Sequence, residues 1–280
     1  MRIFILIQFQ KYISILLQKT KEMRKKLLYL RGFMWIGLFK SIYINLRLLP
    51  FRQAIKLPII VSKSTHLDSL SGEIIVGVKV KFAMLRIGFV HTDFMSWKEN
   101  RNFIKIDGKW LINGQINLGV GSKIIINENA NLSTGDNFVS GSNLRIVCRD
   151  RIEIDSNFRA AWDVQIMDTN FHYIKEIETG KVQRKANPIF IGQNNWIGNR
   201  SSIMSGTQTP DFFIIASNSL CNMNYKKDFQ SFTLVGGTPA KLIKTNVCRV
   251  LDKEEREIDK LFAETNLAEL IVNKEPRARH

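Results

Sequence analysis

The chain is poor in cysteine and histidine. Its 280 residues include three cysteines and four histidines. Cys148, Cys221 and Cys248 are an odd number without paired spacing, which argues against a disulfide framework or a zinc site. A reducing compartment, the cytoplasm, is therefore expected.

The start of the chain lacks the apolar run that a membrane span requires. The segment MRIFILIQFQKYISILL is interrupted by Gln8, Gln10 and Lys11. It contains neither an uncharged run of about eighteen residues nor a small-residue cleavage site. The segment therefore reads as neither a span nor a secretory signal.

Acidic residues are also scarce near the start. Residues 1–60 hold twelve Lys or Arg and a single acid, Glu22, so they carry +11 of the net charge of +16. The remaining 220 residues carry only +5. A nucleic-acid partner is not expected, because the body of the protein has no strong positive charge.

The basic excess lies in a segment with helical character. Residues 1–48 read as one or two amphipathic helices within a leader of residues 1–55, and Pro50 and Pro58 end them. A basic amphipathic helix can lie on an anionic membrane surface, and the apolar residues 33–39 favour that interpretation. The alternative is a cap or oligomer-contact helix whose charges are merely solvated.

A period of six residues dominates the middle of the chain, which differs from the periods of a helix or a simple strand. It suits short strands joined at tight corners, three per coil, with an aliphatic residue inside and a glycine relieving the corner. The sequence thus predicts a parallel β-helix. The positions of this register are Ile191, Ile197, Ile203, Thr209, Ile215 and Cys221, followed by small residues at Gly192, Gly198 and Ala216 and by Ser201 and Ser219 four places on.

Weaker copies of the pattern extend the predicted β-helix over residues 56–246. Lys56 to about Lys123 has strand-like texture, typical of opening coils. The steps between the groups are not multiples of six, so we expect bulges or corner insertions there. The first clean hexad runs from Leu118 to Ile124, and the series resumes at Thr134, Ser140, Ile146 and at Ile154, Ala160, Ile166. Beyond them, residues 247–280 form a tail in which Val250–Val272 predicts an amphipathic helix that covers the open end.

One long excursion, residues 173–190, interrupts the regular coils, and loops that leave a rigid scaffold often carry function. His172 stands at its mouth, whereas His66 and His91 lie in irregular opening coils and His280 is terminal. Asp163, Asp168 and Asn170 lie nearby in sequence and are candidates to orient the ring of a general base. The excursion itself carries a net +2, which suits an acidic or phosphate-bearing acceptor.

These motifs together resemble the hexapeptide-repeat acyltransferases, and most closely the sugar O-acetyltransferases of bacterial capsule and surface-polysaccharide clusters. The resemblance covers about residues 116–246. It rests on the hexads, on the segment MDTNFH around His172, on WIG at residues 196–198 and on GTPAK at residues 237–241. Thr238, Pro210 and Phe212 depart from the usual residues, and a lysine usual near Asn222 is missing.

The resemblance implies a left-handed β-helix that is usually a homotrimer, with active sites between neighbouring prisms. It implies acetyl-CoA as acyl donor, a sugar or glycan acceptor, and His172 as the base that removes a proton from the sugar hydroxyl. Trp196 would flank the pantetheine arm, Gly198 and Ser217 would offer backbone groups to it, and Lys241 would lie near the nucleotide phosphates.

Three alternatives to sugar O-acetylation involve the same fold or the basic leader. An amino-sugar N-acetyltransferase has the same repeats and stays open. A non-enzymatic scaffold on a membrane surface also stays open. A metal-dependent lyase of this fold needs three converging histidines, and the regular coils contain one, so no metal site is expected.

Overall fold

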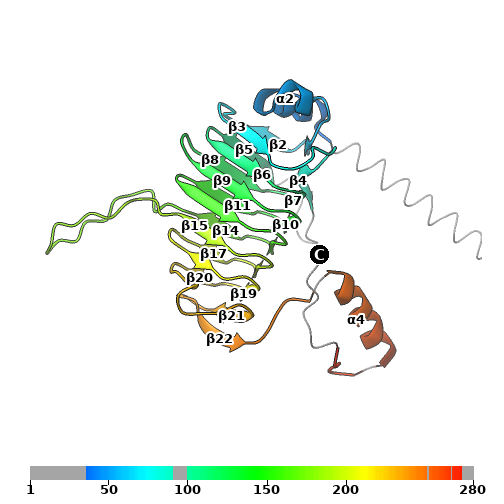
Figure 1. The fold of residues 1–280 in the computed structure, drawn as a ribbon, viewed down its shortest axis with the longest axis vertical. Helices are drawn as coiled ribbons and strands as arrows, with labels where there is room; N and C mark the ends of the chain where they lie inside the picture. The colour runs from blue at the N-terminus through cyan, green and yellow to red at the C-terminus, as the bar shows by residue number, and fades with distance from the viewer. Residues whose placement is uncertain (1–35, 91–99, 251, 266, 273–280) are drawn as a thin grey trace, which may run out of the picture.

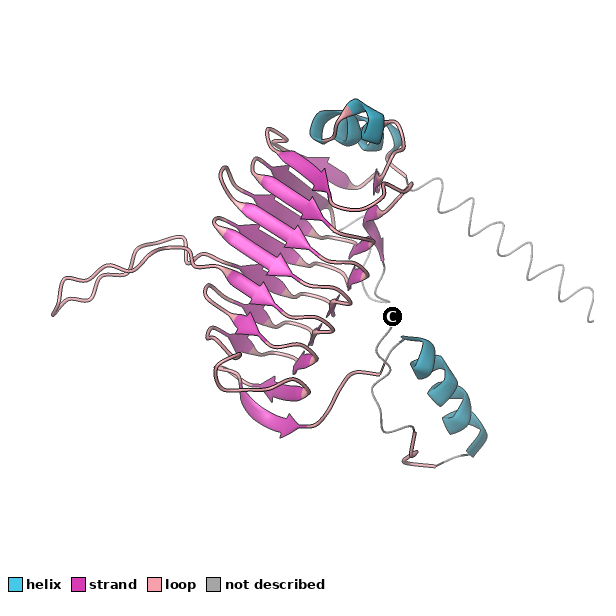
Figure 2. Cartoon of the chain, viewed as in Figure 1, coloured by secondary structure: helices cyan, strands magenta, loops and turns pink. Residues whose placement is uncertain are grey.

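The computed structural model describes residues 36–90, 100–250, 252–265 and 267–272. The expectations for residues 1–35, His91 and His280 therefore lie outside the described residues. Strands dominate the described part, and they wind into three sheets that form the faces of a prism (Figures 1 and 2).

The three faces follow one another in every coil. The first sheet holds β1 (Ile59–Val61), β4 (Leu85–Val90), β7 (Ile116–Gly119), β10 (Phe138–Ser140), β13 (Arg159–Ala160), β16 (Trp196–Ile197), β19 (Phe213–Ile215), β21 (Thr233–Gly236) and β22 (Lys241–Thr245). The second holds β2 (Thr65–Leu67), β5 (Asn102–Ile106), β8 (Lys123–Ile126), β11 (Arg145–Cys148), β14 (Gln165–Met167), β17 (Ser202–Ile203) and β20 (Leu220–Cys221). The third holds β3 (Glu73–Val76), β6 (Lys109–Ile112), β9 (Asn131–Thr134), β12 (Arg151–Ile154), β15 (Ile189–Ile191) and β18 (Gln208–Thr209). Apart from β22, neighbouring strands are parallel, and the chain is a left-handed parallel β-helix, as the sequence predicts.

Coil length varies, as the irregular steps in the sequence predict. In the second sheet, Ile124 pairs with Ile146 after 22 residues and Ile146 with Ile166 after 20. Ile166 pairs with Ile203 after 37, because the excursion lies between them, and Ile203 pairs with Cys221 after 18. The extra residues lie at the corners, so the inward-facing residues of successive coils stay aligned with one another. The opening coils are irregular, as expected: Ile59 pairs with Leu85 after 26 residues, and β4 pairs with β7 through a register shift between Ile87 and Val90. His66 lies within β2 of these coils.

Each hexad sends two side chains inward, at the first and fifth positions. Ile197 and Ser201 are both fully buried, as are Ile203 and Thr207. The bulky departure after Pro210 is accommodated in two ways. Phe213 fills the interior against Tyr225 and Phe229, and Phe212 turns outward to stack on Phe232 with ring centroids 4.6 Å apart.

Between Asn137 and Asn218, two of the three corners in each coil use a left-handed backbone conformation. Eight residues with positive φ there form pairs six apart, mostly asparagine, which tolerates this conformation. Their side chains stack between coils: Asn137 Nδ2 donates to Asn157 Oδ1 at 2.8 Å, and Asn143 Nδ2 donates to Asp163 Oδ1 at 2.9 Å. The pairs are Asn137 and Asn143, Asn157 and Asp163, Asn194 and Arg200, and Phe212 and Asn218.

The expected role of the repeat glycines is therefore wrong. Gly135 and Gly198 have no positive φ, and other residues make the turn. A Cβ on Gly198 would lie 2.5 Å from Ser217 N, and one on Gly135 would lie 2.5 Å from Ser156 N. Glycine is needed because the next coil passes too close for any side chain.

The N-terminal end of the prism is capped by α2 (Leu38–Leu48), which is followed by α3 (Phe51–Ala54). Strand β1 would otherwise present unpaired backbone groups. Asn45 Nδ2 donates to Ile59 O at 2.7 Å, while Asn45 Oδ1 accepts from Ile59 N at 3.1 Å. Ser41 Oγ accepts from Val61 N at 3.0 Å. Residues 38–48 therefore cover the edge of the first coil.

The C-terminal end is closed differently from the expectation. Strand β22 turns back and pairs antiparallel with β21, so a strand rather than a helix satisfies this edge. Helix α4 (Asp252–Thr265) stands beside the prism (Figure 1). Within the described residues, every helix is too short or too polar to cross a bilayer.

Asn45 offers a test of the cap. We expect Asn45→Leu to lower the free energy of unfolding by about 1–3 kcal/mol, because it leaves Ile59 N and O buried without partners. Urea unfolding and hydrogen exchange at the Ile59 amide measure the effect. Leu46→Asn, on the exposed side of the same helix, is the matched control, and a larger loss from this control would contradict the cap.

Candidate active site

The excursion is an antiparallel hairpin that leaves the edge between the second and third sheets. Its arms are joined by bridges from Thr169 to Ala186 and from Lys175 to Val182. It extends from β14 far beyond the prism (Figures 1 and 2). Several apolar side chains along it are exposed, the most exposed being Tyr173, Ile174, Ile177 and Val182.

His172 lies at the base of this hairpin with its side chain exposed. Its backbone N–H donates to Asn170 O at 2.7 Å, across Phe171, whose φ is +61°. A three-residue turn closed in this way around a bulky residue is rare and strained. The strain indicates that the surrounding contacts hold His172 at this point of the hairpin.

Two contacts hold the turn. Thr169 Oγ1 accepts from the N–H of Phe171 at 3.0 Å. The guanidinium of Arg149, one coil earlier, lies 5.7 Å from the centre of the Phe171 ring. The turn before His172 is therefore fixed to the rigid prism on one side of the hairpin.

Asp168 supports the same corner from inside. It is fully buried, and its two carboxylate oxygens accept from the N–H groups of Arg149 and Asp150, each at 2.8 Å. Burial raises the pKa of Asp168 above its ordinary value, against the opposing effect of these two hydrogen bonds. Within the described residues, the carboxylate oxygens of Asp168 accept hydrogen bonds from these backbone N–H groups rather than from the imidazole ring of His172.

The other two predicted orienting residues lie in different settings. Asn170 shares the base of the hairpin, and its backbone N–H donates to Lys185 O at 2.8 Å. Asp163 lies at the edge between the first and second sheets, where it accepts from Asn143. Asp168 follows Asp163 by five residue steps along an extended segment, a distance of about 16 Å. Within one chain, Asp163 and His172 therefore lie on different edges of the prism.

The residues predicted to bind the donor gather on that other edge. Trp196 lies on the outer face of the first sheet and is 38% exposed. Gly198 lies directly against Ser217 of the next coil. The turn before Lys241 packs below them, since Gly237 N donates to Ser219 Oγ at 3.1 Å, and Lys241 itself is exposed in β22. These four residues form what we call the donor wall.

Three arginines near the hairpin base and the donor wall are not predicted as site residues from the sequence. Arg149 contacts Phe171, as described above. The guanidinium of Arg200 lies 4.6 Å from the Trp162 ring centre, next to the donor wall, and that of Arg249 lies 5.8 Å from the Trp196 ring centre. Arg200 has a sequence signal, because it replaces asparagine at a corner position. Arg249 has none, since it follows the last coil.

The thiols are unsuited to nucleophilic chemistry. Burial raises the pKa of Cys221 to about 12 and also raises the pKa of Cys148 and of Cys248. These groups therefore stay protonated near neutral pH. No cluster of three or more His, Cys, Asp or Glu side chains suited to a metal occurs within the described ranges.

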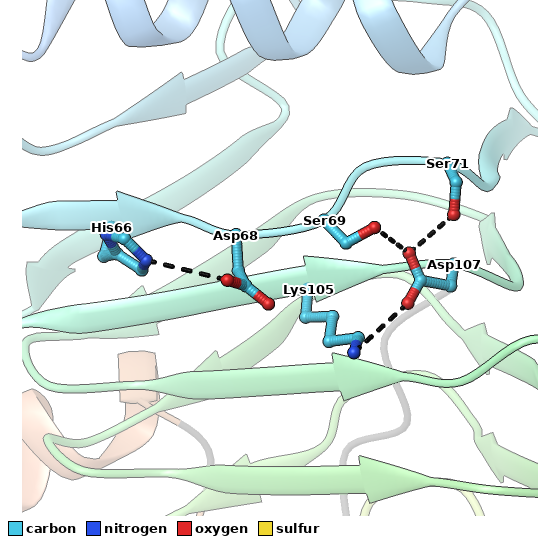
Figure 3. Close-up of polar contacts among 6 residues, drawn as sticks. All are labelled: His66, Asp68, Ser69, Ser71, Lys105 and Asp107. Atoms are coloured by element: carbon cyan, nitrogen blue, oxygen red, sulfur yellow. Dashed lines mark hydrogen bonds and ion pairs between the residues drawn. The ribbon is translucent and has the colours of Figure 1, made fainter.

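His66 is the other described histidine within the β-helix, and Figure 3 shows its surroundings. Its Nε2 lies 3.8 Å from Asp68, and its ring stacks on Phe103. The neighbouring Asp107 accepts from the hydroxyls of Ser69 and Ser71. Burial acts to raise the pKa of Asp107, but these hydrogen bonds and Lys105 lower it overall. The cluster joins β2 to β5, so we interpret it as structural.

Several solved structures are similar to this chain at low sequence identity. No family model matches the chain. It is similar to the structure of a polySia-specific acetyltransferase, NeuO, with 20% identity, 72% of this chain and 98% of that one covered, and a TM-score of 0.44. It is also similar to a galactoside acetyltransferase in complex with coenzyme A, with 24% identity, coverage of 49% and 64%, and a TM-score of 0.38. A third is a hexapeptide-repeat acetyltransferase from Vibrio cholerae O1 biovar eltor complexed with acetyl coenzyme A, with 21% identity, coverage of 45% and 64%, and a TM-score of 0.36.

Asp168 offers a test of the corner beneath the hairpin. We expect Asp168→Asn to lower the free energy of unfolding at neutral pH by about 1–3 kcal/mol, because an amide NH₂ then faces a backbone N–H. The pKa of Asp168 is raised above 3.8, so its contribution to the free energy of unfolding falls as pH rises from 3.8 through the folded value. The advantage of wild type over the variant should shrink across that window in urea unfolding; an advantage that grows would contradict the assignment.

Proposed function

We propose that the protein is an acetyl-CoA-dependent O-acetyltransferase that acts on a hydroxyl of a surface polysaccharide or its precursor. The observation that carries the proposal is His172, which stands on a strained turn fixed to the prism at the base of the hairpin. Its place within the MDTNFH segment, followed by the WIG and GTPAK motifs, supports acetyl transfer. Because acetyl-CoA is an intracellular metabolite, the proposed reaction is cytoplasmic.

The chemistry needs one base and no covalent enzyme intermediate. A neutral ring nitrogen of His172 accepts the proton of the sugar hydroxyl while the hydroxyl oxygen attacks the thioester carbonyl carbon. The carbon–sulfur bond breaks, the thiolate of CoA leaves, and it takes up the proton from the imidazolium. An alcohol is a poor nucleophile near neutral pH, so a positioned base accounts for a large part of the rate.

The donor wall provides complementary contacts for acetyl-CoA. The face of Trp196 suits the pantetheine arm, and the missing side chain at Gly198 lets the arm approach the backbone beside Ser217. Lys241 is one cation for the phosphates. Arg200 adds a second cation beside the wall, in place of the lysine that is missing near Asn222. Arg249 also lies there, where it pairs with Glu255 at 3.4 Å.

A homotrimer completes the site in this proposal. His172 and the donor wall lie on different edges of one prism, with the second sheet between them. In a closed ring of three copies, the hairpin edge of one prism faces the donor wall of the next. The exposed apolar side chains along the hairpin suit such a contact, since they would otherwise remain in water.

Substitution of His172 tests the base. We expect His172→Ala to lower kcat by about 10²–10⁴-fold with little change in the KM for acetyl-CoA. Thiol release from acetyl-CoA with a panel of oligosaccharides measures this. His66→Ala is the matched control and should retain close to wild-type turnover. Unchanged turnover in His172→Ala, or an equal loss in both variants, would overturn the assignment.

Mixing two inactive variants tests whether the site spans two copies. We expect His172→Ala and Trp196→Ala to be weakly active alone and to regain activity when refolded or expressed together. When equal amounts of the two variants assemble at random, about a quarter of all sites combine an intact histidine with an intact wall from the next copy. Absence of recovery, with mixed oligomers shown by mass spectrometry, would place the site within one chain.

A further inference from the structure

Helix α2 exposes most of its apolar side chains to solvent, which is the reverse of a usual surface helix. The side chains that face the prism include Ser41 and Asn45, which bond the edge of β1, together with Ile44 and Leu48. The side chains that face outward are mostly apolar, and Phe39 is 86% exposed. A helix on a soluble surface normally shows the opposite arrangement. The outward apolar residues of α2 are Leu38, Phe39, Ile42, Tyr43 and Leu46.

Two neighbouring segments extend this apolar surface. Beyond α2, Phe51 and Ile55 are exposed at 70% and 59%. The loop of residues 77–83 adjoins them, because Ala83 N donates to Leu57 O at 3.1 Å, and it exposes Phe82 at 68%. We call the outward side of α2, α3 and this loop the end face.

Cations surround the end face, and acids are absent from the segments that build it. Residues 36–67 and 77–90 contain no Asp or Glu. Lys40 turns toward the prism, where its Nζ donates to Lys63 O and Thr65 O. The one acid that shares a groove with Arg47 is Glu73, and it pairs with Lys109 at 3.0 Å. The remaining cations of the end face are Arg47, Arg52, Lys56, Lys79 and Lys81.

We propose that the end face is a docking surface for an anionic lipid bilayer. Exposed aromatic and aliphatic side chains insert at the boundary between headgroups and acyl chains, and a ring of cations attracts lipid phosphates. The absence of acids favours a negatively charged surface over a second copy of this basic chain, whose end face would repel it.

This placement fits the geometry of the molecule. The end face lies at the α2 end of the prism, the hairpin leaves its side, and β22, which carries Lys241, lies at the opposite end (Figure 1). Docking through the end would stand the prism upright on the bilayer and leave its edges free. An acetyl acceptor attached to lipid would then be held close to the edges that carry His172.

The full-length protein is tested by flotation with phosphatidylglycerol-containing vesicles and with pure phosphatidylcholine vesicles. We expect binding to the anionic vesicles only, and weaker binding at high salt. The variant Phe39→Ser, Phe51→Ser, Phe82→Ser should bind at least about tenfold more weakly. The control variant Leu261→Ser, Leu267→Ser, Ile271→Ser removes exposed apolar groups near the C-terminus and should bind as wild type does.

A second variant tests the charges. Sedimentation of the end-face variants measures their oligomeric state, which tests whether a second copy of the chain binds the end face instead. Arg47→Gln, Arg52→Gln, Lys56→Gln should weaken binding to anionic vesicles at low salt and lose most of its effect at high salt. Unchanged binding in both end-face variants would overturn the proposal and place membrane contact elsewhere, for instance in residues 1–35. A change in oligomeric state without a change in vesicle binding would also overturn it, by assigning the face to a second copy. Acetyl transfer to a soluble acceptor should be unaffected, which separates this proposal from the proposed activity.

Discussion

The structure depends on backbone hydrogen bonding between successive coils. Each strand of the prism pairs with the same face of the coil before and after it, so a residue in one coil stands in a column with its counterparts. Ile124, Ile146, Ile166 and Ile203 make one such column. This stacking fixes which side chains are inside, and it leaves only the corners and the two ends free to vary.

The close approach of coils explains the constraints at the corners. Gly135 and Gly198 lie where a Cβ would collide with the next coil. Between Asn137 and Asn218, residues in the left-handed conformation, mostly asparagine, make two of the three turns. The third corner, between the second and third sheets, is less regular. It accepts insertions without disturbing the columns, because the chain can leave and return at the same register. The hairpin that carries His172 uses this freedom.

The ends pose the opposite problem, since each leaves a row of unpaired backbone groups. At the N-terminal end, Asn45 and Ser41 satisfy that row with polar side chains directed inward, and the apolar side chains of the helix consequently face outward. The end face proposed to contact lipid is thus a direct consequence of how the prism is closed. At the other end, β22 supplies the missing hydrogen bonds.

The sequence by itself determined the β-helix, because a six-residue period with buried positions such as Ile197 and Ile203 is local and repeats. It also located His172 at the mouth of the excursion. Tertiary structure alone decided the rest. Asp168 faces the amides of Arg149 and Asp150, Phe171 rests on Arg149, and the donor wall occupies a different edge from His172. These contacts join residues from different coils, and their pairing depends on coil lengths of 18 to 37 residues that the period alone does not specify.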